Sequence, residues 1–178
     1  MYREIEISRE TVFLGKIVNV RRDVAEIHGG QLAAREVVEH PGGVCIIPVE
    51  PDGRFWCVRQ FRYPFMEELL EFPAGKLERG EDPLACAVRE LKEETGLTAG
   101  RVDYLGPMYP SPGYLDEIIH LYLARDLTQG KACPDEGEFL SVECIPGARL
   151  RAMAMQNEIP DAKTVVGLFK AQAFLAGA

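Results

Sequence analysis

The chain is 178 residues long, with 47% hydrophobic and 27% charged residues, which is the composition of one ordinary globular domain with a real core. Its net charge of −8 and pI of about 5.0 exclude the basic face that binds nucleic-acid phosphates, so we expect no nucleic-acid polymer as partner. The apolar runs are far shorter than the roughly 20 residues of a membrane helix, and the charged start is unlike a signal peptide, so a cytoplasmic protein without a membrane partner is expected.

Strand patterns dominate the first third of the chain. Residues 13–40 predict two or three strands with a turn at the sequence HGG (28–30), and this stretch is modestly polar on both faces. The continuous apolar run 42–50 predicts a strand that is covered on both faces. The sequence PDG at 51–53 predicts a turn, and hence a hairpin between this strand and the next one, at 54–63.

A helix is predicted after the sequence LLEFPAG. Asp82 is a good N-cap, Pro83 suits the first helical position and Gly96 suits the C-terminal stop. Between them, four apolar residues follow the spacing i, i+3, i+4, i+7 and predict the buried stripe of the helix. These four are Leu84, Ala87, Val88 and Leu91.

The remainder of the chain predicts strands followed by two helices. Strands are expected over 101–109, 117–127 and 138–145, with a turn-rich sequence PSPGY after the first of them. Helices are expected over 147–156 and 162–177. Strands that alternate with few helices indicate a mixed α+β fold.

The sequence RELKEE in the first predicted helix crowds like charges together. Glu90 and Glu94 are four residues apart and share a helix face, Glu93 lies at its edge, and Arg89 precedes Glu93 by four residues. A solvated acidic face is one interpretation. However, like charges at this spacing cost roughly 0.2–0.5 kcal/mol, and the helix dipole disfavours acidic groups near its C-terminal end. A hard cation such as Mg²⁺ would remove both penalties. The spacing alone leaves both interpretations open.

The surrounding sequence resembles the Nudix box, G-x5-E-x7-R-E-U-x-E-E-x-G-U with U aliphatic. It matches at nine fixed positions without departure: Gly75, Glu81, Arg89, Glu90, Leu91, Glu93, Glu94, Gly96 and Leu97. Members of this family hydrolyse a nucleoside diphosphate linked to another group. The resemblance implies an α+β Nudix fold, a mixed β-sheet sandwiched between helices, in which the box forms a loop–helix–loop that holds metal ions.

The resemblance also assigns roles within the box. It implies that Glu90, Glu94 and the main-chain carbonyl of Ala74 bind two or more Mg²⁺ or Mn²⁺ ions. Glu93 would lie beside these ligands in the catalytic site, and Arg89 would orient the glutamates. Because both the site and a diphosphate substrate are anionic, divalent ions are needed to bring the two together.

Several flanking stretches resemble the ADP-ribose pyrophosphatase branch of the family. These are AAREVVEHPGGV, VRQFRYP followed by EFPAGKLE, the S-P-G segment, and DAKT at the start of the last helix. The resemblance implies hydrolysis of ADP-ribose to AMP and ribose 5-phosphate. Alternatives are a Nudix hydrolase of another nucleoside diphosphate sugar such as GDP-mannose, a hydrolase of a dinucleotide, and a non-catalytic sensor that only binds ADP-ribose.

The same branch implies a division of the chain and a dimer. Residues 1–40 would form a small N-terminal antiparallel β-domain that pairs with the partner subunit and completes the substrate site, and residues 41–178 would form the Nudix hydrolase domain. The expected assembly is a homodimer with intertwined N-terminal domains. The sequence itself shows only that the first 40 residues are too few to fold without support.

The resemblance places further site residues outside the box. In the sequence PDEGEFL, Glu136 would be the catalytic base and Glu138 an additional metal ligand, although Asp135 or Glu117 are alternatives for the base. The substrate would be contacted by four other residues, with the two arginines on its diphosphate or terminal ribose. These are Arg35, Arg62, Pro112 and Gly113.

Overall fold

The computed structural model describes residues 2–133 and 139–177, which contain ten strands and three helices. The chain divides into two compact units. One consists of Met1–Gly42 together with Tyr109–Ile118, and the other of Gly43–Met108 together with Ile119–Ala178. The structure therefore adds a second segment, Tyr109–Ile118, to the unit that contains the predicted N-terminal β-domain.

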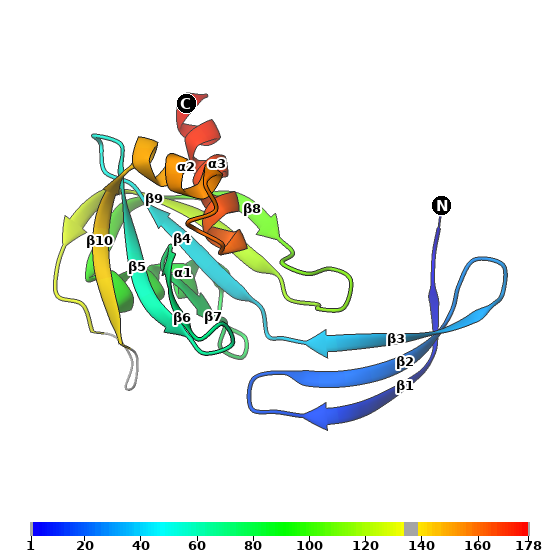
Figure 1. The fold of residues 1–178 in the computed structure, drawn as a ribbon. Coiled ribbons are helices and arrows are strands. Elements are labelled where there is room, and N and C mark those ends of the chain that lie inside the picture. The colour runs from blue at the N-terminus through cyan, green and yellow to red at the C-terminus, as the bar shows by residue number, and fades with distance from the viewer. Residues whose placement is uncertain (1, 134–138, 178) are drawn as a thin grey trace. The chain divides into compact units, whose positions relative to one another are not determined.

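The N-terminal unit is a three-stranded antiparallel sheet in the order β1-β2-β3 (Figure 1). Its strands are β1 (Ile5–Leu14), β2 (Asn19–Glu26) and β3 (Leu32–Glu39). The HGG turn links β2 to β3 as predicted, whereas the first strand begins well before residue 13, where it was expected. Tyr109–Ile118 joins this sheet through Val38, whose amide donates to the carbonyl of Tyr114 at 2.7 Å and whose carbonyl accepts from the amide of Asp116 at 3.1 Å.

The larger unit contains two sheets, one with strand order β10-β5-β6 and one with order β7-β4-β9-β8. Within the second sheet β4 and β9 pair in parallel, whereas β4 with β7 and β8 with β9 pair antiparallel, so this sheet is mixed. The strands and helices of the larger unit are β4 (Gly43–Pro48), β5 (Arg54–Arg62), β6 (Glu67–Glu71), β7 (Ala74–Lys76), α1 (Pro83–Thr95), β8 (Leu97–Met108), β9 (Ile119–Gln129), β10 (Leu140–Pro146), α2 (Gly147–Met155) and α3 (Ala162–Ala176).

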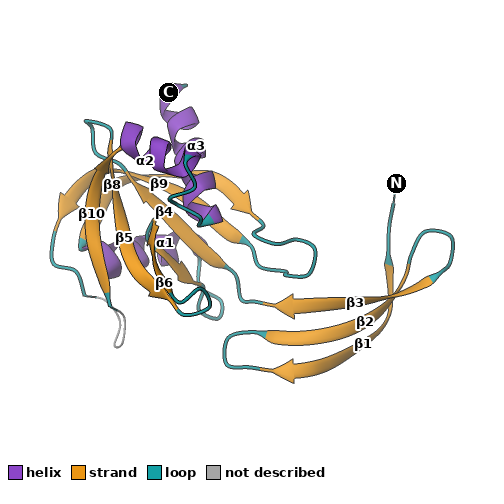
Figure 2. Cartoon of the chain, in the orientation of Figure 1, coloured by secondary structure: helices purple, strands orange, loops and turns teal. Residues whose placement is uncertain are grey.

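Strand β4 is buried over its whole length, as its continuous apolar sequence predicted. Alternate side chains enter two separate cores. Ile46 packs with Ala87 and Leu91 of α1, whereas Ile47 packs with residues of α2 and α3. The sheet is therefore covered by α1 on one face and by α2 and α3 on the other (Figure 2), which confirms the predicted sandwich of a mixed sheet between helices.

The predicted hairpin between β4 and β5 is wrong. The turn at PDG forms, with the amide of Gly53 donating to the carbonyl of Glu50 at 3.0 Å. Beyond this turn, however, the segments that lead to β4 and β5 are joined by the single bridge Val49–Phe55. The strands then diverge into different sheets, because β5 pairs with β10 and β6 instead. Of the described helices, none is long and apolar enough to cross a membrane.

Candidate active site

Helix α1 has the ends that its sequence predicted. The Asp82 carboxylate accepts a hydrogen bond from the amide of Ala85 at 3.0 Å, and Pro83 occupies the first turn. At the other end Gly96 is left-handed, with φ of 73°, and its amide donates to the carbonyl of Lys92 at 2.8 Å. These local signals place the acidic residues in the second half of the helix.

The buried face of α1 differs from the predicted stripe. Ala87 and Leu91 are buried, but Leu84 and Val88 are 44% and 42% exposed. The helix is rotated so that Glu94 faces inward, with only 2% of its surface exposed. Apolar spacing alone misplaces this face, because one of the buried positions is a carboxylate. An inward-facing, nearly inaccessible carboxylate is unusual in a protein interior and indicates a functional site at this end of the helix.

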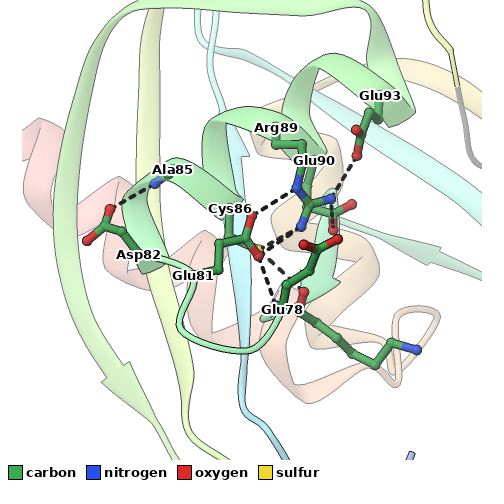
Figure 3. Close-up of polar contacts among 9 residues, drawn as sticks. Glu78, Glu81, Asp82, Ala85, Cys86, Arg89, Glu90 and Glu93 are labelled. Carbon is green, nitrogen blue, oxygen red and sulfur yellow. Dashed lines mark hydrogen bonds and ion pairs between the residues drawn. The ribbon is translucent and has the colours of Figure 1, made fainter.

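Arg89 is the centre of the polar contacts on α1 (Figure 3). Its Nε and Nη2 donate to the two oxygens of Glu81 at 2.9 and 3.1 Å. Its Nη1 donates to Glu90 Oε1 and to Glu93 Oε2, both at 2.8 Å. The contact with Glu93 is the one that the four-residue spacing predicted, and the contact with Glu90 agrees with the expectation that Arg89 orients the glutamates. The contact with Glu81 was not anticipated. One guanidinium thus fixes three carboxylates, and their combined charge stays negative.

The electrostatics follow from these contacts. The hydrogen bonds from Arg89, together with the amide of Glu78, lower the pKa of Glu81 from 4.5 to about 2. The same bonds to Glu81 raise the pKa of Arg89 further above its ordinary value. Glu81 and Arg89 therefore stay charged at neutral pH. Three carboxyl groups gathered around a single guanidinium favour a further cation at this place.

Strand β7 lies directly against the acidic face of α1. The amide of Ala74 donates to Glu94 Oε2 at 3.1 Å. A Cβ added at Gly75 would lie 1.7 Å from Glu90 Oε1, so only glycine lets this carboxylate rest on the strand backbone. The backbone of β7 therefore lies directly against the carboxylates of Glu90 and Glu94. This close approach explains why the box begins with glycine.

The residues gathered here fit a hard divalent cation. Carboxylate and carbonyl oxygens are the ligands that Mg²⁺ prefers, and it usually takes only one or two carboxylates, completing its shell with waters and phosphate oxygens. Within residues 2–133 and 139–177, no group of three or more His, Cys, Asp or Glu side chains forms a preassembled metal cage. Such a cage is not needed for a cation that arrives with a phosphorylated ligand.

The predicted substrate residues lie in both units. In the larger unit, Arg62 of β5 donates from Nε and Nη2 to the two oxygens of Glu71, at 2.7 and 2.6 Å. In the N-terminal unit, Arg35 forms a similar pair with exposed Glu4, at 2.8 and 2.7 Å.

Pro112 and Gly113 are also in the N-terminal unit, in an exposed turn within Tyr109–Ile118. Glu117, an alternative for the catalytic base, belongs to that unit too and lies 3.3 Å from His40 Nδ1. The preferred base Glu136, the additional ligand Glu138 and the other alternative Asp135 lie outside the described residues.

Two charged residues near the box were missed by the sequence reasoning. Glu71 is buried at the end of β6 and contacts Lys163 of α3 as well as Arg62. A signal was present, because Glu71 interrupts the apolar run of LLEFP and Lys163 is part of DAKT. The two are 92 positions apart, however, so no local pattern pairs them.

The sequence profile of the NUDIX domain matches residues 39–165. The chain belongs to the NUDIX domain family. Two curated bacterial proteins show a similarity that extends over nearly the whole chain. An ADP-ribose pyrophosphatase from Bacillus subtilis is 38% identical over 167 residues, covering 93% of this chain and 90% of that protein. A methanol dehydrogenase activator from Bacillus methanolicus is 38% identical over 170 residues, covering 94% and 92%.

A solved structure extends the likeness to three dimensions. The crystal structure of an ADP compounds hydrolase superposes with a TM-score of 0.86 at 25% identity, covering 98% of this chain and 95% of that one. The likeness to this structure thus includes the N-terminal strands, which lie almost entirely outside the residues that the NUDIX profile matches. The acidic helix, the glycine strand and the central arginine are accordingly the Nudix box of this chain, in folded form.

Proposed function

We propose that this protein hydrolyses the diphosphate bond of ADP-ribose, releasing AMP and ribose 5-phosphate, with Mg²⁺ or Mn²⁺ as cofactor and two or more ions in each site. The similarity to an ADP-ribose pyrophosphatase along nearly the whole chain carries the choice of substrate. The reaction type is supported by the intact box, in which Arg89 fixes the carboxyl groups of Glu81, Glu90 and Glu93. A binding-only sensor would have no need for this arrangement.

Divalent ions, when bound, would neutralise the diphosphate oxygens and lower the pKa of an attacking water. Glu90, Glu94 and the carbonyl of Ala74 are proposed to hold them. Arg89 keeps Glu90 and Glu93 in fixed orientations, so little reorganisation is needed when substrate arrives. Because Glu94 is nearly inaccessible to water and accepts a hydrogen bond from the Ala74 amide, its position is set by the fold.

The remaining steps use residues on either side of the box. Glu136 is proposed to take the proton from the attacking water, as a general base, and Glu138 to add a metal ligand. Arg62 is proposed to contact the diphosphate or the terminal ribose, with Arg35 as a further contact. Pro112 and Gly113 are proposed to line the substrate site.

A substrate panel tests this proposal. ADP-ribose, GDP-mannose and a dinucleotide are each incubated with the protein and Mg²⁺, and release of nucleoside monophosphate is followed with time. We expect ADP-ribose to have the highest kcat/KM and to yield AMP and ribose 5-phosphate in equal amounts. If ADP-ribose is cleaved no faster than the other compounds, the proposed substrate is wrong.

We further propose a cytoplasmic homodimer built through the N-terminal sheet. Every residue of β1 is exposed, and large apolar side chains gather there. A soluble monomer rarely leaves such a surface uncovered. These side chains are Ile5, Ile7, Val12, Phe13 and Leu14. Light scattering during gel filtration should give twice the chain mass of 19.8 kDa, and a mass of one chain would contradict the dimer.

A further inference from the structure

A buried ionic cluster lies in the larger unit next to the box. Glu71 of β6 is 1% exposed and accepts two hydrogen bonds from Arg62 of β5. Lys163 of α3 contacts the same carboxylate and also lies 3.0 Å from Asp161. Two consecutive, paired strands and a helix from a distant part of the chain therefore meet at one carboxylate.

The cluster keeps Glu71 ionised. Burial acts to raise the pKa of Glu71, but the hydrogen bond from Arg62 and the charge of Lys163 lower it below the ordinary value. A buried carboxylate without partners would be strongly destabilising, whereas two cations compensate it here. Because both cations converge on one anion, Glu71 is held from two sides.

The pairing also fixes the direction of Arg62. A guanidinium that binds a carboxylate through Nε and Nη2 carries Nη1 on its opposite side. The Arg62 side chain is 37% exposed, so its outer part is accessible to a ligand. A lysine could not be oriented in this way, because its ammonium is a compact charge and not a planar group with two separate edges.

The Glu71 segment connects Arg62 to the acidic box. Its hydrogen bonds to Glu71 raise its pKa, burial opposes this rise, and the more distant charges of Asp161 and Glu94 add to it. In addition, Glu71 is followed by the short segment that leads to Ala74, whose amide binds Glu94. A partly exposed cation is thus linked, through Glu71 and the segment to Ala74, to a carboxylate that is proposed to hold metal ions, and a diphosphate bound there needs a second counter-charge.

We propose that Glu71 is a positioning residue, which directs Nη1 of Arg62 toward the diphosphate of the substrate, and that Lys163 holds Glu71 in place for this task. This inference rests on the proposed function, in which Arg62 contacts the substrate. The competing explanation is that the cluster only fastens α3 to β6. A hydrogen bond of 2.9 Å from the amide of Phe72, the residue after β6, to Thr164 of α3 already joins this part of the chain to the helix.

The first test uses Glu71→Gln, which keeps the size of the side chain but replaces one acceptor with a donor. The fork with Arg62 cannot form, so we expect the KM for ADP-ribose to rise roughly tenfold with kcat within about threefold, as for the loss of one charge-assisted hydrogen bond. Glu68→Gln is the matched control, because Glu68 lies on the same strand but is exposed. Its KM should stay within about twofold of wild type.

Two measurements separate positioning from mere stability. In a cycle with Arg62→Lys, the effect of Glu71→Gln on KM should largely vanish, because it acts through Arg62. Nitrogen-15 NMR should show a protected, downfield Nε–H signal of Arg62 in the wild type that is lost in Glu71→Gln. Should this variant fail to fold, Glu71→Asp retains the charge and withdraws the carboxylate by one methylene, and the same two results are expected.

The inference is overturned if a folded Glu71 variant keeps both the Arg62 signal and the KM of the wild type, or if the two substitutions have additive effects on KM. A loss of thermal stability alone would support the fastening role instead. Failure of the proposed function is a separate result, in which wild type releases no AMP from ADP-ribose. In that case the NMR signal still decides whether Glu71 positions Arg62.

Discussion

Replacing Gly75 with alanine would displace one carboxylate of the box without changing any polar group. The new Cβ would lie 1.7 Å from Glu90 Oε1 and 2.0 Å from its Cδ. Ordinary contact begins at 3.4 Å, so the carboxylate must withdraw by about 1.7 Å. The backbone at Gly75 is not left-handed, and the clashing atoms end a flexible side chain, so we expect the fold to survive.

The expected effect is on catalysis. A misplacement of about 1 Å at a reacting centre can cost on the order of 100-fold in rate, so kcat/KM for ADP-ribose should fall by about that factor. The melting temperature should change by no more than about 4 °C, which corresponds to roughly 1 kcal/mol for a chain of this size. AMP release and a Mg²⁺ titration measure the first effect, and calorimetry measures the second.

Gly177→Ala is the matched control, because a Cβ there meets nothing closer than 3.6 Å. It should leave both activity and melting temperature unchanged. The reasoning is refuted if Gly75→Ala keeps kcat/KM within about threefold of wild type, since the position of the Glu90 carboxylate would then not matter.

Three further predictions concern stability. Gly96→Ala places a Cβ at φ of +73° and 2.6 Å from a backbone nitrogen, so it should lower the unfolding free energy in urea by about 1–3 kcal/mol or more. Thr164→Val removes the acceptor of the Phe72 amide and should cost about 1–3 kcal/mol in the same assay; a loss below about 0.5 kcal/mol would argue against this bond. Arg89 lowers the pKa of Glu81 from 4.5 to about 2, so this carboxylate stabilises the fold above pH 4.5 and loses that contribution as the pH falls toward 2. Wild type should therefore melt above Glu81→Gln at pH 7, with the difference narrowing below pH 4.5, and an equal difference at all pH values would contradict the pairing.

Local sequence determined the ends and the general chemistry of α1. Asp82, Pro83 and Gly96 act within a few residues of their partners, so capping rules were sufficient. The rotation of the helix was not predictable in this way, because it depends on strand β7, where the amide of Ala74 donates a hydrogen bond to the Glu94 carboxylate. The exposure of Leu84 follows from that tertiary contact.

Long-range pairing accounts for the remaining differences between the predicted and the observed structure. The turn at PDG was correctly predicted, but β5 leaves it to pair with β10, which lies more than 70 residues later in the chain. In the same way, the sequence shows Glu71 only as a break in an apolar strand. The structure shows that Lys163 and Arg62 contact it. Local patterns predicted the ends of α1 correctly, whereas partners from distant segments decide what a buried charge does.

The central claim is that the box carboxylates hold the metal ions that allow ADP-ribose to be hydrolysed. The most direct measurement is AMP release by wild type and by Glu94→Gln, each with Mg²⁺ and with excess chelator. The Ala74 amide can still donate to the glutamine oxygen, so the fold should persist, as circular dichroism would verify. We predict AMP release only by wild type with Mg²⁺. Turnover by folded Glu94→Gln, or by wild type in chelator, would contradict the account.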